Sequence, residues 1–190
     1  MSTLTKIHQN GVNVDQLTET IGHLKDNPEL ARFQFRARTE WIDGGQSRTE
    51  IQGFYGAGQE DTSREKAFVL EGDEPPVLLG SNAGPNAVET LLHSLASCLA
   101  VGIAYNAAAS GIEIDHLEME LEGDLDLRAF LGITKPEDSR PGYEQIRVNY
   151  RIETDAPRDK VEALCAYVQE TSPVLDMLRN PVAVEVNLVD

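Results

Sequence analysis

One long apolar run constrains the fold of this chain more than any other feature. Residues 86–111 read NAVETLLHSLASCLAVGIAYNAAASG, and they predict a helix over 87–109 that is apolar on nearly every side. A helix of this kind is enclosed by other elements, and its Ala, Ser and Gly residues allow another helix to approach closely. Because the run also carries Glu89, His93 and Asn106, we interpret it as a core helix and not as a membrane span.

The segments around this helix predict a mixed fold. Period-two alternation and turn signals predict strands at 33–41, 47–56, 67–71, 117–127, 143–152 and 182–189. Helical periodicity predicts an amphipathic helix within 14–33 and another within 156–173, and Asn86 is a candidate N-cap for the long helix. We therefore predict an α+β fold, in which two β-hairpin units and a closing strand form sheets around long central helices. We expect residues 1–32 to form an N-terminal helical extension to a domain of residues 33–190.

Charge patterning predicts which strands pair. Acidic residues alternate with apolar ones along 117–127, whereas 143–152 carries Arg147 and Arg151 on one face. Opposite charges on neighbouring strands are favourable, so we expect these two strands to pair. The acids do not predict a metal site, because they spread over about 26 Å along one strand.

Composition excludes several classes of function. The net charge is −16, with 16 basic residues against 32 acidic ones, which disfavours nucleic acids and anionic membranes as partners. Four histidines show no ligand spacing, two cysteines form no C-x-x-C pair, and we expect neither metal nor cofactor. The N-terminal residues lack the pattern of a signal peptide, and with so few cysteines we expect a reducing cytoplasm.

Two separated motifs resemble the OsmC/Ohr superfamily. They are GPNAVETLLHSLASCLAVGIAYNAAASGIEIDHLEMELEGDLDL at 84–127 and TSPVLDMLRNPVAVEV at 171–186, and they occur in the family's order. The resemblance covers about residues 33–190 and is nearer to the YhfA-like branch than to the two-cysteine peroxidases. It implies an intertwined homodimer with active sites at the subunit boundary. It also implies the reduction of organic hydroperoxides by a peroxidatic and a resolving cysteine, tuned by an Arg and a Glu.

The resemblance assigns roles to individual residues. Cys98 matches the peroxidatic cysteine, but Ser172 stands where the resolving cysteine is expected. The activating Glu falls at Val88, with Glu89 one residue later, and an ideal helix places Glu89 on the side opposite to Cys98. The Arg comes from the first hairpin, with Arg48 as the first choice and Arg38 as the second.

Two functions remain open. In the first, Cys98 is the thiol of a one-cysteine peroxidase, and an external thiol reduces it. Arg48 stabilises the thiolate and the peroxide, and Glu89 is the remaining candidate catalytic residue. In the second, the homodimer binds a small hydrophobic ligand without redox chemistry, and Cys98 is a packed residue in the pocket wall. Cys165 lies about 10 Å along its helix axis from Ser172, so we expect it to pack in the core and not to resolve Cys98.

Overall fold

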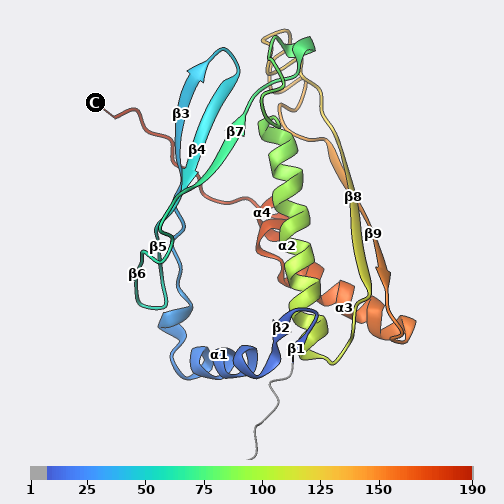
Figure 1. Cartoon of the computed structure of the whole chain (residues 1–190). Helices are drawn as coiled ribbons and strands as arrows, with labels where there is room; N and C mark the ends of the chain where they lie inside the picture. The colour runs from blue at the N-terminus through green and yellow to red at the C-terminus, as the bar shows by residue number, and fades with distance from the viewer. Residues whose placement is uncertain (1–7, 190) are drawn as a thin grey trace, which may run out of the picture. The chain divides into compact units, whose positions relative to one another are not determined.

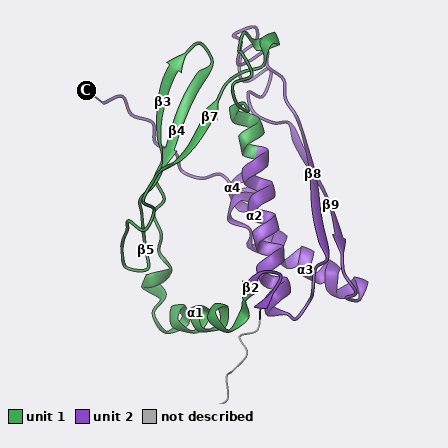
Figure 2. Ribbon diagram, viewed as in Figure 1, with its two compact units in different colours: residues 1–7, 13–91 green, residues 8–12, 92–190 purple. Residues whose placement is uncertain are grey.

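The computed structural model describes residues 8–189, which form two compact units (Figure 1). The first unit contains residues 13–91, and the second contains residues 8–12 and 92–189 (Figure 2). Helix α2, Ala87–Ala109, begins in the first unit and continues in the second. The fold is α+β, as predicted. The part of the predicted N-terminal extension before residue 8 lies outside the described residues, and its boundary with a domain of 33–190 stays a prediction.

The first unit begins with the predicted amphipathic helix and continues as short strands. Asn13 caps the helix by accepting a hydrogen bond from the Gln16 backbone N–H. The elements before α2 are α1 Val14–Asp26, η1 Pro28–Ala31, β3 Arg38–Asp43, β4 Gln46–Ile51, β5 Phe54–Gly56, β6 Gln59–Asp61, β7 Phe68–Gly72 and η2 Pro76–Leu78. Strands β3, β4 and β7 form one antiparallel sheet in that order, while β5 pairs with β6.

The first hairpin starts later than the sequence predicts. Strand β3 begins at Arg38 and not at Phe33, because β4 ends at Ile51 and offers no partner to the earlier residues. Residues 33–37 instead meet β5 through a single bridge, in which the backbone N–H of each of Gln34 and Tyr55 donates to the carbonyl of the other. The strand predicted over 47–56 is therefore divided between β4 and β5.

A buried carboxylate fixes the chain between β7 and α2. Asp73 is buried, and its oxygens accept hydrogen bonds from the backbone N–H groups of Glu74, Ser81 and Ala83 and from the Ser81 hydroxyl. These bonds, led by the one from the Ser81 hydroxyl, hold the pKa of Asp73 far below its usual range. The ionised carboxylate thus ties residues 74–83 into a defined loop ahead of α2.

The second unit packs a sheet and two helices onto α2. Its elements are β1 His8–Gln9, the start of β2 Val12–Asn13, most of α2, β8 His116–Asp124, β9 Gln145–Glu153, α3 Arg158–Thr171 and α4 Pro173–Arg179. Its core consists of Leu95, Leu99, Ile103, Ala107, Ile112, Leu164 and Val168. By length and composition α2 could also span a membrane, and within its own chain only one face of the helix is buried in this core, instead of nearly every side as predicted.

The charged strands pair as predicted. In the antiparallel ladder of β8 and β9, Glu118 lies opposite Arg151 and Glu122 lies opposite Arg147. The Arg147 guanidinium also contacts Asp124, and its hydrogen bonds lower the pKa of that carboxyl. Arg147 is partly buried, but its carboxylate partners and the Arg151 pair are exposed, so the pairs contribute little to stability individually and mainly favour this register.

The predicted closing strand is not formed. Residues 180–189 belong to no helix or strand, and Val184, Val186 and Leu188 are exposed. A strand needs a neighbouring edge to satisfy its backbone groups, and the described part of this chain pairs no edge with this segment.

The sequence pattern did not predict α4. Ser172 caps this helix by accepting a hydrogen bond from the Leu175 N–H.

Helices α2 and α3 approach each other closely at a glycine. A Cβ atom on Gly102 would lie 2.8 Å from Cγ1 of Val168, which is too close for a normal contact. Val168 is itself almost fully buried. The absence of a side chain at Gly102 therefore sets the separation of the two helices.

We expect Gly102→Ala to destabilise the protein by about 1–3 kcal/mol, because the added methyl overpacks the contact with Val168. Urea unfolding followed by circular dichroism measures this change. The matched control is Gly22→Ala within α1, where a Cβ would meet nothing within 4 Å. That variant should gain about 0.5–1 kcal/mol from helix propensity. A Gly102→Ala protein as stable as the parent would contradict the close approach.

Candidate functional site around Cys98

Cys98 lies in the second unit with its sulfur against a buried hydroxyl. The Cys98 Sγ is 3.2 Å from Oγ of Ser172, which is within hydrogen-bond distance for sulfur. Cys98 is partly buried, and Ser172 is only 4% exposed. The residue that stands at the predicted resolving position therefore does face Cys98, but it carries oxygen where a disulfide requires sulfur.

Helix geometry explains this contact. Cys98 lies one turn before Gly102 on α2, and Ser172 lies one turn after Val168 at the end of α3. The close approach at Gly102 and Val168 therefore also brings together the turn that precedes Gly102 on α2 and the turn that follows Val168 on α3. Ser172 is held further by its backbone, since its N–H donates to the Val168 carbonyl and its carbonyl accepts from the Asp176 N–H.

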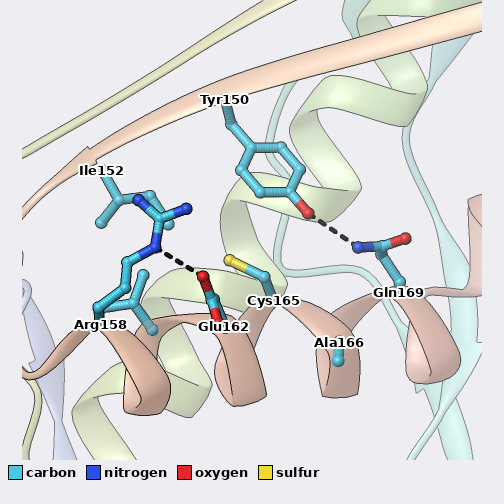
Figure 3. Close-up of a pocket in the computed structure, with 8 residues that line it drawn as sticks. Tyr150, Ile152, Arg158, Glu162, Cys165, Ala166 and Gln169 are labelled. Atoms are coloured by element: carbon cyan, nitrogen blue, oxygen red, sulfur yellow. Dashed lines mark hydrogen bonds and ion pairs between the residues drawn. The ribbon is translucent and has the colours of Figure 1, made fainter.

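Cys165 lies on a groove and not in the core stripe where we expected it. The groove has a volume of about 320 Å³ and lies between β9 and α3. Figure 3 shows the Cys165 thiol between two polar pairs. At one end Nε2 of Gln169 donates to the Tyr150 hydroxyl over 2.9 Å, and at the other Nε of Arg158 donates to Glu162 over 2.7 Å. Burial raises the pKa of the Cys165 thiol, against a smaller opposing effect of a hydrogen bond from Tyr150.

The residues that line this groove follow a pattern in the sequence. Tyr150 and Ile152 share one face of β9, while Arg158, Glu162, Cys165 and Gln169 recur at helical spacing along α3. Burial raises the pKa of the Tyr150 hydroxyl, so its proton stays in place at neutral pH. The groove is therefore a mixed polar and apolar surface, with one ion pair at its end, around a protonated thiol.

The predicted arginines lie in the sheet of the first unit. Arg48 on β4 forms an ion pair of 2.9 Å with Glu71 on β7, and Arg38 on β3 pairs with Glu40. Both guanidinium groups are more than half exposed. Each arginine thus forms an ion pair with a carboxylate of its own unit. The role predicted for Arg48 in the chemistry of Cys98 stays a prediction.

Glu89 takes part in the start of α2. Its Oε2 accepts a hydrogen bond from the Asn86 backbone N–H, while the Asn86 side chain accepts one from the Glu89 N–H, both over 2.9 Å. This reciprocal pair is a capping box, and it confirms Asn86 as the N-cap. Glu89 therefore has a structural role in this arrangement, and its predicted catalytic role stays a prediction.

The described residues hold no evident metal site. Within residues 8–189, no group of three or more His, Cys, Asp or Glu side chains is placed to bind an ion. The chemistry that the second unit can offer is that of two thiols in different surroundings. Cys98 faces a buried hydroxyl, whereas Cys165 lines an open groove.

Comparison with solved structures finds proteins of the same fold. An OsmC-like protein from Mycoplasma pneumoniae aligns with a TM-score of 0.57 and 17% identity over 78% of this chain and 89% of its own. An OsmC-like protein from Vibrio cholerae aligns at 0.57 and 10% identity over 75% and 92%. An organic hydroperoxide resistance protein, OsmC, from Legionella pneumophila aligns at 0.50 and 18% identity over 77% and 89%.

Sequence comparison identifies the family. None of the curated proteins compared with this chain matches it. The family model described as OsmC-like protein matches residues 80–187, which is more than half of the chain and includes both Cys98 and Ser172. The chain therefore belongs to the OsmC-like protein family, within the OsmC/Ohr superfamily.

Proposed function

We propose that this protein is a one-cysteine thiol peroxidase that reduces small hydrophobic hydroperoxides in the cytoplasm. One observation carries the proposal: the Cys98 sulfur has a buried polar partner, Ser172, that cannot form a disulfide with it. Membership of the OsmC-like family supports the hydroperoxide as substrate, because a structural relative from Legionella pneumophila is described as an organic hydroperoxide resistance protein.

The proposed reaction has two stages. The Cys98 thiolate attacks the distal oxygen of the hydroperoxide, the O–O bond breaks, and the alkoxide leaves as an alcohol after taking a proton. Cys98 becomes a sulfenic acid. An external thiol then condenses with it, releasing water and forming a mixed disulfide, and a second external thiol restores Cys98. In this scheme Arg48 stabilises the negative charge that develops on the reacting oxygen.

We also propose that the protein is a homodimer. The supporting observation is the amount of apolar surface that one chain leaves uncovered. Trp41 and Phe68 on the first sheet are exposed, as are Val101 and Tyr105 on α2 and the apolar side chains of 182–189. Exposed apolar side chains in each unit are typical of a protein that buries them in an interface.

Light scattering at micromolar concentration tests the assembly. We expect a mass of about twice the 20.9 kDa of the chain, because the helix over 87–109 is too uniformly apolar for its own chain to cover. A mass equal to that of one chain would refute the homodimer.

Intact-mass analysis after a stoichiometric amount of an organic hydroperoxide tests the chemistry. We expect the mass of the protein to rise by one oxygen, and a dimedone-type reagent should trap the product. The Cys98→Ser variant, which keeps Cys165, is the matched control and should remain unmodified. The loss of two hydrogens, with both thiols protected from alkylation, would mean that Cys165 resolves Cys98. An unmodified protein would contradict the peroxidase and favour the ligand-binding alternative.

A further inference from the structure

We propose that Ser172 is a positioning residue for the Cys98 nucleophile, which it holds by donating a hydrogen bond to the sulfur. This inference deepens the proposed function and rests on Cys98 as its reacting group. It assigns to Ser172 an active role in place of the resolving role that its oxygen cannot perform.

The direction of the hydrogen bond follows from the inventory of protons. The Sγ and Oγ atoms are 3.2 Å apart, and either could donate when Cys98 is a thiol. An ionised sulfur has no proton, so in the reactive form only the Ser172 hydroxyl can donate. A hydrogen bond to an ionised group is stronger than one between neutral groups. The contact is therefore strongest in the form of Cys98 that attacks a substrate.

The second partner of Ser172 leaves its proton available. The Leu175 backbone N–H donates to Oγ over 3.4 Å, which occupies a lone pair and not the hydroxyl hydrogen. Ser172 is 4% exposed, so water has little access to compete for that hydrogen. The capping bond to α4 thus holds the oxygen in place and leaves its hydrogen free to be donated to the sulfur.

The test measures alkylation of Cys98 by iodoacetamide in a Cys165→Ala background. The Cys98 thiolate attacks the methylene carbon of the reagent, a C–S bond forms, and iodide leaves. At a fixed near-neutral pH, Ser172→Ala should slow this reaction about three- to tenfold, because it removes the hydrogen-bond donor. Ser172→Thr retains a hydroxyl and should restore the rate to within about twofold of the parent.

A control variant measures whether losing a helix cap elsewhere in the chain affects Cys98. Asn13→Ala removes the capping bond to the Gln16 N–H of α1 and should leave Cys98 alkylation unchanged. An equal rate in the Ser172→Ala and parent proteins would overturn the proposal. So would a Ser172→Thr protein that is as slow as Ser172→Ala.

A Ser172→Cys variant tests the juxtaposition even if the other variants fold poorly. In the Cys165→Ala background, mild oxidation should join the two facing sulfurs, and the mass should fall by two hydrogens. Failure to form this disulfide would overturn the contact on which the proposal depends. Alkylation needs no peroxide, so the two proposals can fail separately. If hydroperoxides do not oxidise the protein but the alkylation rates are as predicted, the proposed function is wrong and the role of Ser172 is supported.

Discussion

The second unit depends on how closely α2 and α3 approach each other. Gly102 has no side chain to separate the helices, and Val168 packs directly against it. This contact fixes the adjacent turn of both helices, where the Cys98 sulfur meets the Ser172 hydroxyl. The arrangement of the candidate site is therefore a consequence of core packing, and its polar pair is positioned by apolar neighbours.

The surroundings of the two thiols differ because neighbouring positions of α3 face different elements. One set of positions meets Cys98 on α2, and Cys165 lies on the other. Val168 and Ser172 face α2, whereas Cys165 faces β9 across the groove of Figure 3. Burial raises the pKa of the Cys165 thiol and keeps it protonated, although a hydrogen bond from Tyr150 opposes this effect. Cys98 therefore has a defined polar contact with Ser172, whereas Cys165 stays a protonated thiol in the wall of an open groove.

Much of the fold could be predicted, because its strongest signals are local. The long helix has the predicted ends, its Asn86 cap forms, and the acidic strand pairs with the strand that carries Arg147 and Arg151. The segment 182–189 alternates like a strand, but a strand also needs an edge to pair with, and alternation carries no information about that edge. The Asn10–Gly11 turn of the β1–β2 hairpin was missed because its strands are only two residues each.

The candidate site was only partly predictable for a similar reason. The resemblance placed Ser172 opposite Cys98, and the structure brings the two together. The groove around Cys165 could not be located from the stripe of α3 alone, because that stripe does not reveal where β9 crosses it. Helical periodicity groups residues on one face but does not distinguish a core contact from the wall of an open groove.

The most direct measurement of the central claim is a crystal structure of the protein after exposure to an organic hydroperoxide. The account predicts one added oxygen on the Cys98 sulfur, within hydrogen-bond distance of Ser172, and an unmodified Cys165. Oxidation at Cys165 alone, or a Cys98 sulfur turned away from Ser172, would contradict it.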